Sequence, residues 1–486
     1  MTGTAGREHG IGIRAAPLGR RSMAGNLAAQ GGATCVVFIA SLLVARLSGP
    51  VVLGEYALLR VLPWLTGVVV SCGLPVASAY FLAGERRDDP RLRPTLTLLA
   101  AAGSAVGALL WLVAVPFLGG FFPTVPRWQL ALVAVTVVTQ LLTVWGKACC
   151  QGRADMRGAN LVIVSEELLF LPAYVSALAA GLDGTDAVVA GLVGGGVAAT
   201  ATSLGRLACT GFGRGGGRPS ASLAAEVLRY GARGQLGNVL LLVNLRLDFL
   251  IVGAVSGPAV LGVYAVASKF AELMRLPAVA MHYVLYPRFA RDGPRLAGEE
   301  LRRLLPRALA LTVALVPPLV GASVIALPLL YGRAFQGAVV PACILLVGLA
   351  VEGAAAVSTA YLFGVGRPGL NSWGMGAGVA VTVVLDVLLI PRFGAVGAAV
   401  SSSTAYLVTT VVLVALTRVV TARDPSRADG DTQKQRRRHA LRIRPGFHHE
   451  PTRPRRLRRR RARGPGGADR PVGLASDPPR GGDHPS

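Results

Sequence analysis

Long apolar runs, separated by short polar breaks or by breaks containing glycine and proline, dominate the chain between residues 26 and 421. A helix that crosses a bilayer needs about 20 mostly apolar residues. Twelve stretches of roughly this length follow one another: residues 26–47, 57–83, 95–119, 128–150, 161–181, 185–207, 234–256, 262–286, 305–330, 338–364, 371–390 and 395–419. The pattern therefore predicts an all-α integral membrane protein with about twelve transmembrane helices.

Composition supports this fold class. Of the 486 residues, 52% are hydrophobic and only 15% are charged, whereas a soluble domain carries about 25% charged residues. A soluble enzyme with an ordinary surface is excluded, and so is a wholly disordered chain, which would need low hydrophobicity. The six cysteines lie in apolar stretches without zinc-like spacing, so we expect no metal and no cofactor.

The basic residues are distributed so that they predict an orientation. Cytoplasmic loops of membrane proteins collect lysine and arginine. If the N-terminus lies inside, the inside segments before residue 422 hold 22 basic residues, and the outside segments hold only Arg46, Arg127, Arg333 and Arg392. We therefore expect an even number of spans with both termini cytoplasmic.

The last 65 residues differ from the rest of the chain. Residues 422–486 hold 18 basic and seven acidic residues and nine prolines. This composition predicts a disordered cytoplasmic tail, and polybasic segments beside a membrane span attract anionic lipid. Nucleic-acid binding is the other electrostatic interpretation, but Phe447 is the tail's one aromatic residue, so we expect no nucleic-acid partner.

A short motif occurs twice. SGPVVLGEYA at residues 48–57 and SGPAVLGVYA at residues 256–265 match at eight of ten positions with an offset of 208. Each copy follows the first span of a half, which predicts two parallel six-helix repeats around a central cavity; secondary transporters built this way bind substrate near mid-membrane. The alternative is a helix-end turn that arose twice. The predicted organisation is a cytoplasmic segment, a bundle, a Gly-, Pro- and Ser-rich cytoplasmic linker, a second bundle and the tail: residues 1–25, 26–209, 210–228, 229–421 and 422–486.

Three stretches carry a resemblance to a known family: Leu43–Leu59, Tyr230–Phe289 and Leu330–Ala399. They include LVARLSGPVVLGEYALL, NLRLDFLIVG, LGVYAVASKFAELMRLP, YLFGVGRP and LDVLLIPRFGAVGAA. The chain resembles the polysaccharide biosynthesis proteins, or oligosaccharide flippases, of the multidrug/oligosaccharidyl-lipid/polysaccharide exporter superfamily. The resemblance implies an alternating-access exporter that turns a polyprenyl-diphosphate-linked sugar from the inner to the outer leaflet. It also implies work with polysaccharide-assembly proteins of the cell envelope. The same resemblance implies a plasma membrane and a bacterial source.

Basic residues inside the predicted spans are candidates for a substrate site, because a charge in the bilayer is costly and usually functional. Under the offset of 208, Arg60 corresponds to Ser268, next to Lys269, so the two halves place a cation at matching depths. Two cations facing one cavity suit a diphosphate. We predict that Arg60, Lys269, Asn244 and Arg246 bind substrate. The alternative is that such side chains, Arg246 among them, lie near span ends and reach the interface.

Acidic residues in the spans are candidates for coupling transport to protons or to sodium ions. Asp248 shares a face of the seventh span with Asn244, and Glu272 lies three residues after Lys269. We predict coupling roles for Asp248, Glu272 and Glu352. Mutual neutralisation of Lys269 and Glu272 is the simpler alternative.

Other functional classes are a drug/cation antiporter of the same superfamily, a membrane glycosyltransferase or polymerase, and a membrane scaffold. An antiporter would favour an acidic cavity, whereas cations occur here in both halves. A glycosyltransferase needs acidic or metal-binding loops outside the bilayer, and the short outside loops offer only Glu55, Asp183 and Asp186. We therefore expect a transporter rather than an enzyme.

Overall fold

The computed structural model describes residues 20–214 and 216–423, apart from the side chains of residues 20–24, 233–234, 236–245 and 292–295 and of a few single positions. This part of the chain is helical and contains no strand. The elements are α1 (Arg20–Val70), α2 (Leu74–Ala83), η1 (Glu85–Asp88), α3 (Leu92–Ala114), η2 (Val115–Gly120), α4 (Arg127–Leu132), α5 (Ala134–Gly152), α6 (Met156–Leu168), α7 (Phe170–Ala179), α8 (Gly184–Cys209), η3 (Phe212–Arg214), α9 (Ala221–Ala271), η4 (Glu272–Met274), α10 (Arg275–Tyr331), η5 (Arg333–Ala338), α11 (Val339–Leu349), α12 (Glu352–Gly364) and α13 (Pro368–Arg423).

Three of the long helices are interrupted at a glycine. Gly49 in α1, Gly257 in α9 and Gly394 in α13 have φ values of 80°, 83° and 53°, which are outside the helical range. In α1 and α9 the glycine belongs to the repeated SGP motif, and the proline that follows suits the first turn of a new helix. Both copies of the motif therefore form the same sharp turn between two helical segments.

The two copies of the motif also pack against each other. A Cβ atom added to Gly54 in α1 would lie 1.8 Å from the Pro258 carbonyl oxygen in α9. A Cβ atom added to Gly262 in α9 would lie 2.0 Å from the Pro50 carbonyl oxygen in α1. Gly54 and Gly262 are equivalent positions of the motif, and so are Pro50 and Pro258. In each contact the glycine of one copy therefore lies against the proline carbonyl of the other copy, and the backbones of α1 and α9 touch directly.

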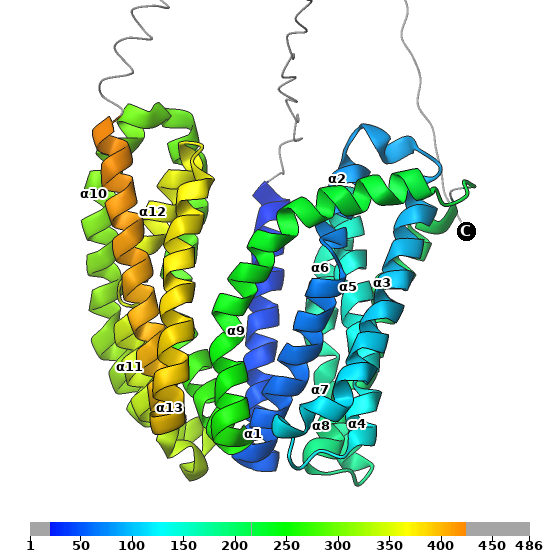
Figure 1. Ribbon diagram of the computed structural model, residues 1–486, viewed down its shortest axis with the longest axis horizontal. Coiled ribbons are helices and arrows are strands. Elements are labelled where there is room, and N and C mark those ends of the chain that lie inside the picture. Colours follow the sequence, from blue (N-terminus) through cyan, green and yellow to red (C-terminus); the bar gives the residue numbers. More distant parts are fainter. Residues whose placement is uncertain (1–19, 215, 424–486) are drawn as a thin grey trace, which may run out of the picture. The chain divides into compact units, whose positions relative to one another are not determined.

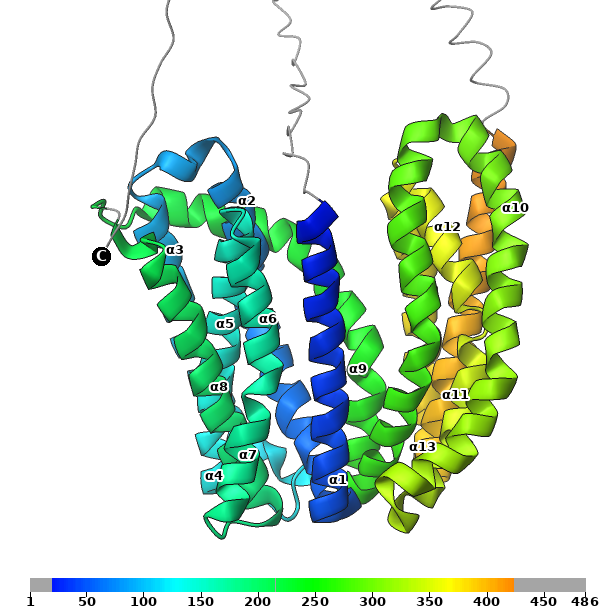
Figure 2. The same ribbon diagram turned by 180° about the vertical axis from the view of Figure 1, so that it is seen from behind.

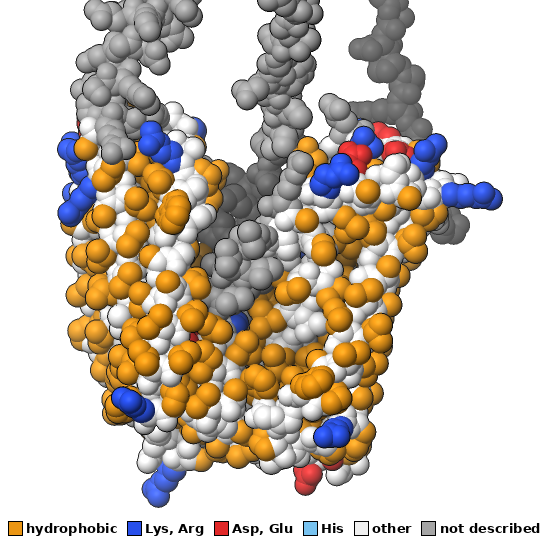
Figure 3. All heavy atoms as spheres, in the orientation of Figure 1, with side chains coloured by type: hydrophobic (Ala, Val, Ile, Leu, Met, Phe, Trp, Pro, Cys, Tyr) orange, Lys and Arg blue, Asp and Glu red, His pale blue; other side chains and the backbone are white. Residues whose placement is uncertain are grey.

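The helices have the length and surface of membrane spans. Eight segments of the described chain are long and apolar enough to cross a membrane, and a ninth is added if the bent pair α11 and α12 forms one span. Apolar side chains cover the flanks between charged ends in Figure 3, and Phe117 and Trp373 are 81% and 75% exposed. The all-α integral membrane fold is confirmed. The division into twelve spans stays a prediction. The predicted spans fall mostly on helical residues, with turns at residues 71–73 and 350–351.

The helices gather on both sides of α1 and α9. Figures 1 and 2 show α3, α5, α6 and α8 on one side, and α10 to α13 on the other. Helix α9 begins at Ala221, inside the predicted linker, and its first turns cross over the end of α2 (Figure 1). The boundaries of the two bundles stay predictions. Residues 1–19 of the predicted N-terminal segment and residues 424–486 of the predicted tail lie outside the described residues.

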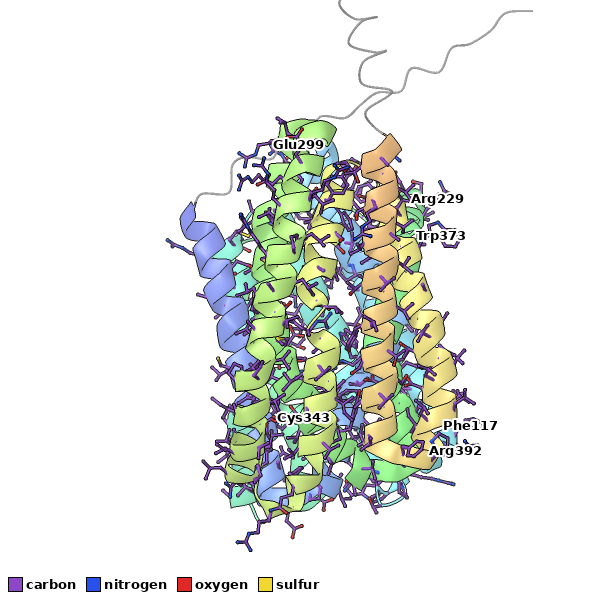
Figure 4. All side chains as sticks on the ribbon, turned by 90° about the vertical axis from the view of Figure 1, so that its left-hand side faces the viewer. Phe117, Arg229, Glu299, Cys343, Trp373 and Arg392 are labelled. Carbon is purple, nitrogen blue, oxygen red and sulfur yellow. The ribbon has the colours of Figure 1, made fainter. Side chains whose placement is uncertain are left out.

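Charged residues that were assigned to opposite sides of the membrane lie at opposite ends of the helices. Figure 4 shows Arg229 and Glu299, both in predicted inside segments, at one end. Arg392, from a predicted outside segment, lies at the other end of the helices, as does Phe117. This placement agrees with the loop assignment made from the arginine distribution.

Candidate functional site

A cavity of about 390 Å³ lies among the helices of the first half and reaches α9. Its walls come from α1, α5, α6, α7, α8 and α9 and include apolar side chains, among them Leu53, Trp64 and Phe249. Four polar side chains of α5 face it as well: Thr136, Thr139, Gln140 and Thr143. Small residues of the neighbouring helix α8, Gly195, Gly196 and Ala199, also line it. The cavity is therefore amphipathic and lies between segments that have the composition of membrane spans.

Three of the predicted substrate-binding residues line this cavity: Arg60 on α1 and Arg246 and Lys269 on α9. The structure thus brings together basic residues that are more than 180 positions apart in the sequence. Two acidic residues, Glu166 and Glu167 on α6, face the same space. Basic side chains outnumber acidic ones on the lining.

Each cation of the cavity has a carboxylate partner. The Arg60 guanidinium donates hydrogen bonds to Glu167 and, at 2.9 Å, to the Tyr56 hydroxyl. The Lys269 ammonium donates to Glu272 at 2.8 Å, and Arg246 lies 3.6 Å from the other oxygen of that carboxylate. Pairing lowers the cost of holding charge away from water. Glu272 therefore lies between two cations, and its coupling role stays a prediction.

The acidic partners Glu166 and Glu167 were not among the predicted site residues. Glu167 pairs with Arg60, and Glu166 accepts a hydrogen bond from Lys147 at 3.0 Å. Both glutamates interrupt an apolar run, and that interruption was the available signal. It could not identify the partners, because Arg60 lies 107 positions from Glu167.

Asp248 does not line this cavity. It is 6% exposed, and its carboxylate accepts hydrogen bonds from the Tyr264 hydroxyl at 2.5 Å and the Phe249 amide at 2.9 Å. The Ser402 hydroxyl on α13 lies 3.5 Å away. The predicted partner on the same helix face, Asn244, has a side chain outside the described part of the structure.

A second buried carboxyl group, Asp386 on α13, was not predicted as a site residue. It is fully buried, and neither of its oxygens has a hydrogen-bond partner among the described residues. The nearby Ser401 hydroxyl donates instead to the Thr382 carbonyl at 3.4 Å. Asp386 lies close enough to Asp248 for the two carboxyl groups to interact electrostatically. Buried polar groups normally have partners, so this unsatisfied acid indicates a function.

Glu352 takes part in a further ion pair. It accepts hydrogen bonds from Arg275 at 3.1 and 3.3 Å, and the Arg275 guanidinium lies 6.0 Å from the centre of the Tyr406 ring. Neither Glu352 nor Arg275 lines the cavity. The 3-10 turn η4 separates Lys269, at the end of α9, from Arg275, at the start of α10. Among the described residues, no three His, Cys, Asp or Glu side chains form a group able to hold a metal ion.

Comparison with known proteins agrees with the helical arrangement. A model of the protein family described as "Polysaccharide biosynthesis protein" matches residues 43–340. No curated protein matches the sequence.

Several solved structures share the fold. A lipid II flippase MurJ in an inward closed conformation is similar with a TM-score of 0.69 and 12% identity, over 81% of this chain and 87% of that one. An inward-facing multidrug resistance MATE family transporter of the MOP superfamily is similar with a TM-score of 0.60 and 15% identity, over 80% of this chain and 94% of that one. The Vibrio cholerae MATE transporter VcmN in the bent form is similar with a TM-score of 0.52 and 12% identity, over 83% of this chain and 97% of that one. At these identities the likeness establishes the fold.

Proposed function

Because the chain belongs to the polysaccharide biosynthesis protein family, we propose that it moves a polyprenyl-diphosphate-linked oligosaccharide from the inner to the outer leaflet. In this proposal the two halves alternate between access from one side of the membrane and access from the other. The cargo serves polysaccharide biosynthesis at a plasma membrane, together with the proteins that assemble the polymer. The fold shared with a lipid II flippase and with MATE transporters supports a role in transport.

One observation carries the proposal: Arg60, Arg246 and Lys269 line a single cavity between membrane-spanning helices. Hydrogen bonds from arginine or lysine to phosphate are charge-assisted and stronger than neutral ones. A diphosphate entering the cavity would take over donors that now serve Glu167 and Glu272. The released carboxylates would then be free to bind a proton or a cation, which links substrate binding to ion movement.

The buried acids of the second half supply a separate place for the coupling ion. Asp248 and Asp386 are both buried, and burial of a carboxyl group favours its protonated form. We propose that this pair shares the coupling role with the carboxylates of the cavity. Glu272 acts within the cation network of the cavity, and Glu352 acts with Arg275.

The experiment measures flipping of a polyprenyl-diphosphate-linked sugar in proteoliposomes by its accessibility to a membrane-impermeant reagent. The double variant Arg60→Gln/Lys269→Gln removes two cations from the cavity. We expect at least a tenfold slower rate, because each charged hydrogen bond is worth about 1.5–3 kcal/mol. The matched control Arg333→Gln/Arg392→Gln removes the same charge from exposed positions and should flip at the normal rate. A normal rate in the cavity variant would refute the proposal.

A drug/cation antiporter is the second candidate, and the unsatisfied carboxyl group of Asp386 is the observation that favours it. Asp386→Asn should abolish dependence of flipping on a proton or sodium gradient, whereas Asp183→Asn, at an exposed position, should retain it. If wild-type protein exchanges organic cations for protons or sodium and does not flip the lipid-linked sugar, the antiporter function is correct instead.

A further inference from the structure

Two arginines of the first half lie close to one aromatic ring, at the predicted cytoplasmic end of α3. The Arg93 guanidinium at the start of α3 lies 5.9 Å from the centre of the Phe212 ring, and the Arg153 guanidinium, after α5, lies 5.8 Å from it. Phe212 belongs to the connection between α8 and α9. Figure 1 shows this connection beside the end of α3.

The hydrogen-bond acceptors of these two guanidinium groups are uncharged. Arg93 donates to the Gly211 carbonyl at 3.3 Å, and Arg153 donates to the Thr210 hydroxyl and carbonyl at 2.9 and 2.8 Å. Within the described part of the chain, neither forms an ion pair with a carboxylate. Arg206 at the same end of the helices does form one, with both oxygens of Asp155. Asp155 also lies near Arg153, so one carboxylate serves two of these three arginines and the region around Phe212 keeps a net positive charge.

A hollow of about 500 Å³ opens beside this cluster. It is lined by residues of α3 and of the α8–α9 connection: Arg93, Pro94, Thr97, Leu98, Ala101, Phe212, Gly213 and Gly217. None of these residues lines the cavity of the candidate site. The hollow is thus a second and separate space, with a cation at one end.

An apolar stripe continues from the hollow along α3. Leu98, Ala102, Ala105 and Leu109 recur at spacings of four, three and four residues, so they lie on one face of the helix. All four are exposed; the values for Leu98 and Leu109 are 55% and 61%. The residues on the opposite face, such as Leu96 and Ala100, are fully buried. The stripe therefore faces the surrounding membrane for about three turns.

We propose that this hollow binds the phosphate of an anionic membrane phospholipid, with an acyl chain lying along the stripe. Arg93 supplies the charge-assisted contact at headgroup level, and Phe212 holds its guanidinium in place by a cation–π contact. A free phosphate would use the arginine but leave the apolar stripe unused. The end of α3 that carries Arg93 is the predicted cytoplasmic end, so the ligand comes from the inner leaflet.

Native mass spectrometry of the full chain in detergent, with phosphatidylglycerol or phosphatidylcholine added, tests the proposal. Wild-type protein should retain phosphatidylglycerol preferentially. Arg93→Gln should bind it about fivefold more weakly, since a basic residue near a membrane surface contributes about that factor toward anionic lipid, and Arg93→Lys should restore most of the preference. The control Arg392→Gln, at the opposite end of the helices (Figure 4), should bind like wild type.

Two further measurements separate a lipid from a free phosphate. Leu98→Ser should weaken phosphatidylglycerol binding without disturbing the arginine, and glycerol 1-phosphate should displace the lipid poorly. The proposal is wrong if Arg93→Gln retains phosphatidylglycerol as wild type does. It is also wrong if glycerol 1-phosphate competes as well as the lipid and Leu98→Ser has no effect, because the hollow then takes a free phosphate.

Discussion

The reciprocal contact between α1 and α9 makes a sharp prediction for Gly54→Ala. Ordinary van der Waals contact of a Cβ atom begins at 3.4 Å, and the new Cβ would lie only 1.8 Å from the Pro258 carbonyl oxygen, a shortfall of 1.6 Å. The obstacle is backbone, so no side chain can rotate away. The two helices must separate, and overpacking of this kind costs about 1–3 kcal/mol.

That cost acts on one state of the protein. If the halves separate here during alternating access, the substitution penalises the state in which α1 and α9 touch. Every 1.4 kcal/mol shifts an equilibrium about tenfold, so the separated state should gain roughly fivefold to a hundredfold in relative population. Transport should slow, because one half of the cycle becomes unfavourable.

Spin labels at Val51 and Ala259 measure this separation directly. Both positions are exposed and are equivalent in the repeat, and the labels require a variant without the six native cysteines. Gly54→Ala should shift the distance distribution toward longer values. Gly67→Ala is the matched control, because it lies in the same helix and its new Cβ would meet nothing within 4 Å. Identical distributions and unfolding temperatures for wild type and Gly54→Ala would refute the reasoning.

Two other predictions concern stability. The Arg206 guanidinium holds the pKa of Asp155 below its ordinary value, so the pair stabilises the fold above about pH 3.9 and this contribution is lost as the pH falls through the lower folded-state pKa. The unfolding temperature of the wild type should therefore fall more steeply in acid than that of Asp155→Asn. Equal dependence of the two unfolding temperatures on pH would contradict this linkage. Trp111→Phe removes the 2.7 Å hydrogen bond from the indole to the Leu130 carbonyl and should lower the unfolding free energy by about 1 kcal/mol or more, and an unchanged unfolding temperature would show that the bond contributes nothing.

Local patterns in the sequence predicted the helical class, because a chain that crosses a bilayer must satisfy its backbone within each span. Apolar run length therefore identified the helices, and the repeated SGP motif marked the turns at Gly49 and Gly257. The break at Gly394 has no SGP motif, but it lies between the predicted spans 371–390 and 395–419.

Site residues were predictable only by type. A charged residue in an apolar run is costly wherever it points, so Arg60, Arg246 and Lys269 could be selected from the sequence, and all three line one cavity. Asp386 was visible in the same way, but its lack of a partner was not, because partners are set by which helices pack together.

The sequence by itself thus determined that this chain forms membrane helices, where those helices turn, and which charged residues they carry. Tertiary packing decided the partner of each charge: Glu167 for Arg60, Tyr264 for Asp248, and no described partner for Asp386. The physical reason is that backbone hydrogen bonding and apolar burial are local or additive along the chain. Ion pairing instead depends on the rotation and spacing of helices that are distant in sequence.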